Sequence, residues 1–168
     1  MTSSSGPGIS LMQEGISYMA SAELPCLIVN LQSGGPCLGT IQPSQGDYFQ
    51  ATKGGGHGDY HMIVLAPSSV QEMADFVFES FRLADKYRTP VMILSDGALG
   101  QMMEKVALPP EGSLPFIEKP WATTGKKPGQ ERHIITSLFM EPEEMEQGNL
   151  KLQKKYRVIE EQEVRYEA

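Results

Sequence analysis

The chain has 168 residues, of which 40% are hydrophobic and 21% charged, and its formal net charge is −7. This size suits one folded domain, and the acidic balance argues against binding a nucleic-acid backbone, which needs a basic face. No apolar run approaches the roughly 20 residues that cross a bilayer, and the hydroxyl-rich start is no signal peptide. Cys26 and Cys37 show no metal-binding spacing, so the expected compartment is a reducing cytoplasm.

The first predicted element is a helix that opens at Pro7, a residue that suits the first helical position. The apolar residues that follow recur at spacings of three and four and predict one buried stripe ending near Ala22. Residues 2–8 have the composition of a turn between a strand and a helix. We therefore expect the strand that leads into this turn to be missing from the chain.

Three apolar runs, 26–31, 62–65 and 91–96, are predicted strands. Continuous apolar strands are typical of a parallel sheet that is covered on both faces. Before the third strand, Ser69 and Glu72 form a capping box at the start of a helix that runs to about residue 86. The expected inward face of that helix carries Met73, Phe76, Val77, Phe81 and Ala84. The order of elements predicts an α/β fold, a parallel sheet with flanking helices.

Residues 32–60 form a long glycine-rich connection with a short helix predicted around 48–51. A connection of this length in a compact domain is usually functional. Its alternating His57, Asp59 and His61 could share one face of a strand, as a metal site requires. A plain turn is the better interpretation, because no fourth ligand lies nearby in the sequence. No glycine motif for nucleotide phosphates is present.

The expected organisation is a domain at 1–106, a Pro/Gly-rich linker at 107–140 and a charged amphipathic helix at 141–168. Adjacent Met102 and Met103 are candidates for a subunit contact. The last helix has a thin apolar stripe, formed by Leu150, Tyr156 and Ile159. This stripe predicts that the helix lies on a partner or on a following domain, and a solvated, frayed tail is the alternative.

Ligands of open parallel sheets bind at the carboxyl ends of the strands. Three segments of this chain leave strand ends there, at 2–8, 32–39 and 96–100. The first combines hydroxyl groups with a helix N-terminus, which suits anions or polar rings, although ordinary helix capping explains the same residues. On the residues alone, the pattern names no reaction.

Several longer motifs follow one another along the chain: TSSSGPGIS at 2–10, ELPCLIVN at 23–30, GGP at 34–36, QPSQGDY at 42–48, KGGGHGD at 53–59 and SDG at 95–97. In this order they resemble the alpha subunit of 2-oxoacid:ferredoxin oxidoreductases, closest to the branched-chain (2-oxoisovalerate) type. The resemblance implies the pyrimidine-binding domain of the thiamine diphosphate fold. It implies that Ser4, Ser5, Gly6 and Pro7 line the aminopyrimidine end of thiamine diphosphate, and that Ser33, Gly34 and Gly35 lie at the substrate.

The same resemblance implies oxidative decarboxylation of a 2-oxoacid to an acyl-coenzyme A, with reduction of ferredoxin. Partner beta and gamma subunits are expected to hold the diphosphate, Mg²⁺ and iron–sulfur clusters, so that the cofactor is shared. No catalytic residue and no metal ligand is assigned to this chain. The 2-oxoacid is left open among branched-chain oxoacids, pyruvate and 2-oxoglutarate.

The sequence departs from the family pattern in two ways. The family has about half a domain more upstream, including the glutamate that activates the pyrimidine, so the resemblance implies an internal fragment. The family also has an arginine at the position of Ser33, where it is expected to meet the substrate carboxylate. A serine cannot offer the paired charged donors of an arginine. A truncated assembly module without activity of its own, or a fragment of another thiamine diphosphate enzyme, are therefore alternatives.

Overall fold

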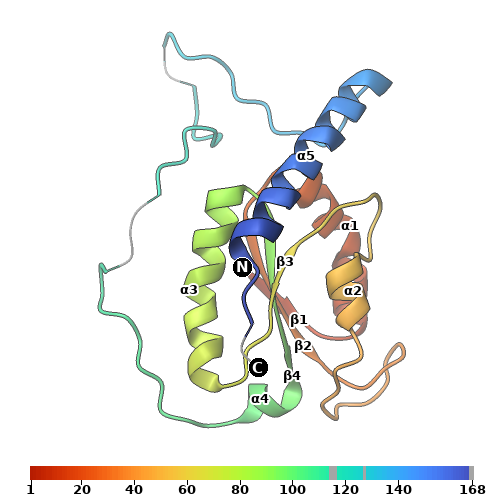
Figure 1. Cartoon of the computed structure of the whole chain (residues 1–168), viewed down its shortest axis with the longest axis vertical. Coiled ribbons are helices and arrows are strands. Elements are labelled where there is room, and N and C mark those ends of the chain that lie inside the picture. The colour runs from red at the N-terminus through yellow and green to blue at the C-terminus, as the bar shows by residue number, and fades with distance from the viewer. Residues whose placement is uncertain (114–116, 127, 167–168) are drawn as a thin grey trace.

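The computed structural model describes residues 1–113, 117–126 and 128–166. Its centre is a parallel sheet of four strands in the order β1-β2-β4-β3, with bounds β1 Thr2–Ser4, β2 Cys26–Gln32, β3 Ile63–Leu65 and β4 Pro90–Asp96. Helices α1 (Pro7–Ser21) and α2 (Tyr48–Lys53) cover one face of the sheet, and α3 (Val70–Tyr87) covers the other (Figure 1). The predicted α/β fold with a parallel sheet is confirmed.

The central strand β4 shows why the apolar runs are continuous. Its Met92 and Leu94 pack with residues of α1 and α2, whereas Val91 packs with Leu83 and Ala84 of α3. Both faces of the strand are therefore buried, which is why apolar residues follow one another from Val91 to Leu94 without alternation. With both faces covered, the ends of the strands are where a ligand can approach the sheet.

Residues 2–4, predicted as part of a turn, form a short strand instead, which corrects the prediction. Residues Thr2, Ser3 and Ser4 form β1 and pair in parallel with residues 28–30 of β2. Thr2 and Ser3 are exposed at the edge of the sheet. The hydroxyl-rich composition of a turn also suits a short edge strand that buries little, so pattern alone could not separate them.

Helix α3 begins as the capping box predicts, with one shift. The Ser69 side chain accepts a hydrogen bond from the backbone N–H of Glu72 at 3.1 Å. The Glu72 carboxylate accepts from the backbone N–H and the hydroxyl of Ser68, one residue earlier than expected, at 2.6 and 2.9 Å. The prediction for Phe81 is wrong: it is 43% exposed, because the buried stripe of α3 runs through Ser80, Leu83 and Ala84.

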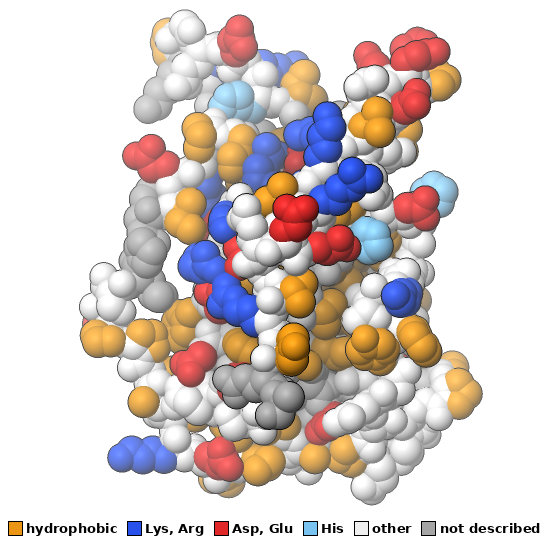
Figure 2. Space-filling model, in the orientation of Figure 1, with side chains coloured by type: hydrophobic (Ala, Val, Ile, Leu, Met, Phe, Trp, Pro, Cys, Tyr) orange, Lys and Arg blue, Asp and Glu red, His pale blue; other side chains and the backbone are white. Residues whose placement is uncertain are grey.

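The last helix, α5 (Pro142–Glu163), packs on this chain's own sheet domain. The ring of Tyr156 is buried and meets His61 edge-on at 5.1 Å between centroids, and Ile159 packs beside Leu83. Tyr156 and Ile159 therefore contact this chain's own domain, which corrects the expected contact with a partner or a following domain for these two residues and the frayed-tail alternative for α5. Leu150, the third residue of the predicted stripe, is 48% exposed, and a partner contact there stays a prediction. Figure 2 shows the lysine and arginine side chains gathered over α5 and the neighbouring part of α3.

The connection before α5 loops away from the sheet domain but is attached to α3 at two places (Figure 1). The Gln71 side-chain amide makes paired hydrogen bonds with the backbone of Ala107, at 2.8 and 3.0 Å. Near the other end of α3, Lys119 lies 2.8 Å from Asp85, and Arg88 lies over the Trp121 ring. No helix among the described residues is long and apolar enough to cross a membrane.

Candidate functional site at the carboxyl edge of the sheet

The loop after β1 brings small residues to the carboxyl edge. Ser4, Ser5, Gly6 and Pro7 are all half-buried. The first turn of α1 closes on backbone carbonyls, because Ser5 and Gly6 accept from the N–H groups of Gly8 and Ile9 at 3.1 Å. No side chain caps α1, so the interpretation of these serines as ordinary helix caps is wrong. A Cβ at Gly8 would lie 2.0 Å from the Ser4 hydroxyl oxygen, so a side chain there would displace that hydroxyl.

The structure brings the two predicted segments together. A Cβ at Gly6 would lie 3.8 Å from the hydroxyl oxygen of Ser33 and 3.7 Å from the carbonyl oxygen of Cys37. Ser33 forms a bridge with Pro43, and the N–H of Gly34 donates to the carbonyl of Gln42 at 3.0 Å. The loop after β2 therefore folds back on itself, and its first residues contact the start of α1.

Two buried polar side chains of β2 anchor the far end of this loop. The Gln32 side-chain oxygen accepts from the backbone N–H of Asp47 at 2.8 Å, and the Asn30 amide donates to the Asp47 carboxylate at 3.2 Å. Asn30 is 0% exposed and Gln32 4%. Sequence reasoning missed these residues, although an amide inside an apolar strand is a signal, because buried polar groups need partners.

Asp96 anchors the next strand end. One oxygen of its carboxylate accepts from the backbone N–H groups of Ala98 and Leu99 and caps α4 (Gly97–Gln101), a helix that the sequence reading missed. The other oxygen accepts from the Gln45 amide at 3.1 Å. The bond from Gln45, with those from the helix backbone, lowers the pKa of Asp96 below its ordinary value. Its carboxylate is therefore charged at neutral pH.

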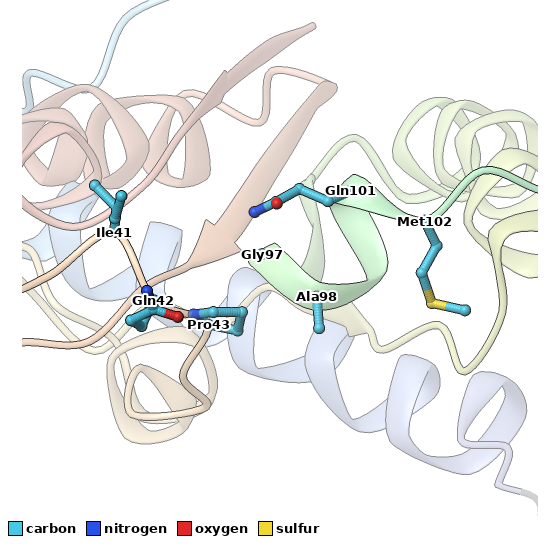
Figure 3. A pocket seen from close by; sticks show the side chains of 7 residues that line it. All are labelled: Ile41, Gln42, Pro43, Gly97, Ala98, Gln101 and Met102. Atoms are coloured by element: carbon cyan, nitrogen blue, oxygen red, sulfur yellow. The ribbon is translucent and has the colours of Figure 1, made fainter.

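Two adjoining hollows lie between the returning loop and α4. The first, of about 360 Å³, is drawn in Figure 3 and is lined by Ile41, Gln42, Pro43, Gly97, Ala98, Gln101 and Met102. The second, of about 600 Å³, lies at the ends of β2, β3 and β4 and is lined by Gln32, Gln45, Tyr48, Ala66, Pro67, Ser68, Leu94, Ser95, Asp96, Ala98, Leu99 and Met102. Because they share Ala98 and Met102, we treat them as one feature, the edge groove.

The predicted site residues stand beside the edge groove and do not line it. Ser33 is continuous with the lining residue Gln32 and bridges the lining residue Pro43, so the predicted substrate segment borders the groove directly. Within the groove, Ser95 is 5% exposed, and its hydroxyl has no hydrogen-bond partner in the described part of the chain.

The glycine-rich segment after α2 has a packing role. The Tyr60 hydroxyl donates to the Gln13 side-chain oxygen and accepts from the N–H of Gly56, both at 3.1 Å. A Cβ at Gly56 would lie 2.5 Å from the Gln13 carbonyl oxygen, so glycine lets the segment lie directly on α1. Across the described residues, no group of three His, Cys, Asp or Glu side chains is arranged to hold a metal ion, at His57 or elsewhere.

Comparison with known families agrees with this fold and these motifs. The family described as pyruvate flavodoxin/ferredoxin oxidoreductase, thiamine diphosphate-binding, matches residues 1–167. The chain belongs to this family. The predicted family resemblance is thereby confirmed.

Individual relatives differ in the substrate that their names give. A ketoisovalerate oxidoreductase subunit VorB of Methanothermobacter thermautotrophicus is 54% identical over 99% of this chain and 47% of its own length. A 2-oxoglutarate synthase subunit KorA of Archaeoglobus fulgidus is 50% identical over 71% of this chain and 34% of its own length. The chain thus spans about half, or less, of the curated relatives it matches.

A solved structure shares the fold. The 2-oxoglutarate:ferredoxin oxidoreductase from Magnetococcus marinus, determined with 2-oxoglutarate, coenzyme A and succinyl-CoA bound, has a TM-score of 0.72 and is 28% identical. The match covers 98% of this chain and 33% of that chain.

The residues at the start of α1 fit the aminopyrimidine end of thiamine diphosphate. They are small and uncharged, their hydroxyls are not used to cap α1, and no large side chain separates Gly6 from Ser33. A flat polar ring needs such room and such hydrogen-bonding groups. The described residues of this edge offer neither a metal-ligand cluster nor a lysine or arginine lining the groove.

Proposed function

We propose that this chain is alpha-subunit part of a thiamine diphosphate-dependent 2-oxoacid:ferredoxin oxidoreductase. The observation that carries the proposal is the short separation between Gly6 and the Ser33 hydroxyl at the carboxyl edge of the sheet, in a chain that belongs to this family. It joins a segment suited to the aminopyrimidine with the segment proposed for the substrate. In the reaction, a 2-oxoacid and coenzyme A yield an acyl-coenzyme A and carbon dioxide, and the two electrons released reduce ferredoxin.

In this proposal the chain positions the cofactor and the substrate, and the cofactor supplies the reactive carbon. When bound, thiamine diphosphate provides the carbanion that adds to the 2-oxo carbon. Ser4, Ser5, Gly6 and Pro7 hold the edge of the pyrimidine and orient it. Ser33, Gly34 and Gly35 face the substrate, and Asn30 and Gln32 keep their loop in place through Asp47.

Partner subunits complete the proposed site. Beta and gamma subunits are proposed to carry the diphosphate, Mg²⁺ and the iron–sulfur clusters. The carboxyl edge offers a surface for such a partner, since Leu38 and Ile41 of the returning loop are 83% and 89% exposed and Met103 is 97% exposed. No charged residue occurs from 33 to 46. The two cysteines are both free thiols, which supports a reducing cytoplasm as the compartment.

The direct test is activity of the assembled enzyme. The chain is isolated together with its co-expressed partner subunits, loaded with thiamine diphosphate and assayed for 2-oxoacid-dependent reduction of ferredoxin with formation of acyl-coenzyme A. Turnover that needs both the oxoacid and coenzyme A is the expected result. Assembly without turnover of any 2-oxoacid would contradict the proposal and favour an inactive assembly module.

The role of position 33 has its own test. Replacing Ser33→Arg adds the charged donors that the family pattern has there, so KM for the 2-oxoacid is expected to fall by roughly tenfold. Ser44→Arg is the matched control, because it adds the same charge to the same loop beyond Pro43. Equal effects of the two variants, or no gain from Ser33→Arg, would remove Ser33 from the substrate site.

A further inference from the structure

The outward side of α5 carries charges that this chain does not pair. Toward the sheet domain the cations of the helix are used, since Lys151 and Lys155 both contact the Glu23 carboxylate. On the other side, two acids and two bases are exposed and form no hydrogen bond or ion pair within the described residues: Glu143, Glu146, Lys154 and Arg157. The first half of α5 projects beyond the sheet domain (Figure 1), which leaves room for a partner along this side of the helix.

These four charges are arranged symmetrically about one apolar residue, Leu150, which is 48% exposed. The acids Glu146 and Glu143 precede it by four and seven residues, and the bases Lys154 and Arg157 follow it by the same four and seven. Steps of three or four residues keep side chains on one side of an α-helix, so these five residues form a single stripe. The stripe is acidic before Leu150 and basic after it, which makes it complementary to its own reverse.

We infer that α5 pairs with the α5 of a second copy of this chain, antiparallel and around a two-fold axis at Leu150. Such an axis places each residue opposite the partner residue that lies equally far on the other side of the centre. Glu143 then faces the partner's Arg157, and Glu146 faces the partner's Lys154. By symmetry each of these ion pairs occurs twice. A parallel pair of helices would instead oppose every charge with itself.

A second copy fits this stripe better than an unrelated surface that is uniformly acidic or uniformly basic. A surface of one sign would meet like charges along half of the stripe, which disfavours its binding. The Leu150 side chains of the two copies meet on the axis and cover each other, whereas in a single chain Leu150 is half exposed. Because ion pairs on an exposed helix are individually weak and screened by salt, the pairing is expected to loosen as the ionic strength rises.

Cross-linking in the assembled enzyme tests the inference and does not depend on activity. Leu150→Cys, in a Cys37→Ser background that removes this chain's exposed thiol, is expected to give a disulfide-linked pair of this chain after mild oxidation. Glu161→Cys is the matched control, because it lies on the same side of α5 but eleven residues from the axis. Its two thiols would stand about 33 Å apart, whereas a disulfide needs Cα atoms within about 7 Å. The control is therefore expected not to cross-link.

Exchanging the charges gives a second readout through the same Leu150→Cys cross-link. Lys154→Glu with Arg157→Glu makes the stripe wholly acidic, and Glu143→Lys with Glu146→Lys makes it wholly basic. Each double variant is expected to lower the yield of linked pairs by roughly tenfold or more, and co-expression of the two should recover it, because all the facing charges are then opposite again. A thiol at position 150 that stays unlinked or links to a different subunit overturns the inference. So does a yield that the double variants leave unchanged, or one that co-expression does not recover.

Discussion

The two ends of the sheet use polar residues in opposite ways. At the carboxyl edge the loops are fastened by neutral amides, as in the bonds of Asn30 and Gln32 to Asp47, and a groove stays open beside them. At the amino edge α5 lies across the strands, and charged pairs fasten it. The ion pairs close a surface between two parts of the same chain, whereas the amide hydrogen bonds hold a loop in place beside an open groove.

The ion pairs of the amino edge form two groups along α5. In the middle of α5, Lys151 and Lys155 both donate to the Glu23 carboxylate. Burial acts to raise the pKa of Glu23, but the two lysines hold it below the ordinary value. Near its end, Glu163 accepts from Lys86 and from the Tyr87 hydroxyl, both at 2.7 Å. These bonds lower the pKa of Glu163 to about 2.

The largest expected effect concerns the apolar contact between those two groups. Tyr156→Ala removes a buried ring and should weaken the docking of α5 by about 3 kcal/mol. Hydrogen exchange of residues 142–163 in the assembled enzyme should then become faster, while kcat stays near its original value. Tyr166→Ala, at a side chain that is 88% exposed, should change neither. A large loss of kcat in Tyr156→Ala would contradict the separation of the two edges.

At the carboxyl edge, Gly39→Ala is expected to lower catalytic activity and to leave the docking of α5 unchanged. Gly39 has φ of +51° and a Cβ there would lie 1.6 Å from the Gly34 carbonyl oxygen, so the loop must move. We expect kcat/KM to fall by roughly tenfold, because misplaced binding groups lose most of their effect. Gly58→Ala is the control, because Gly58 also has a positive φ, of +88°, but a Cβ there would have no neighbour within 4 Å. Equal losses of kcat/KM in the two variants would show that backbone strain at a positive φ, and not displacement of this loop, lowers the activity.

A smaller effect is expected from removing one anchor of the same loop. Gln32→Leu leaves the backbone N–H of Asp47 without its acceptor, at a cost of about 1 kcal/mol to the closed loop. Faster hydrogen exchange confined to residues 40–47, without change in α5, is the expected readout. Gln45→Leu, at an exposed side chain, should have less effect on that segment. Faster exchange throughout the sheet would mean that Gln32 supports the core.

The smallest effect belongs to the ion pairs. Glu163→Gln should weaken α5 docking by at most about 1 kcal/mol, since its cationic partners are partly exposed. Because folding lowers the Glu163 pKa from 4.5 to about 2, its stabilisation is complete above pH 4.5 and is lost as the pH falls toward 2. The variant should lose the part of the acid sensitivity of α5 exchange that comes from Glu163, while the part from Glu23 remains. Glu161→Gln, an exposed control on the same helix, should retain both parts.

Local sequence patterns predicted the elements whose formation depends on neighbours in the chain. Pro7 opens α1, Ser69 caps α3 and the apolar runs form β2, β3 and β4. The predictions failed where a residue's role depends on a distant segment. The edge strand β1 exists through its pairing with β2, α4 through the carboxylate of Asp96, and the register of α3 turns Phe81 outward.

The candidate site divides in the same way. The motifs alone identified the family, because several of them follow one another in the family's order along the chain. The assignment of the Ser4 and Ser33 segments to the cofactor and the substrate stays a prediction. That Gly6 touches the Ser33 loop, that Asn30 and Gln32 hold Asp47, and that α5 covers the amino edge were decided only by the tertiary structure. Each of these contacts joins residues far apart in sequence, and spacing along a chain carries no information about such distances.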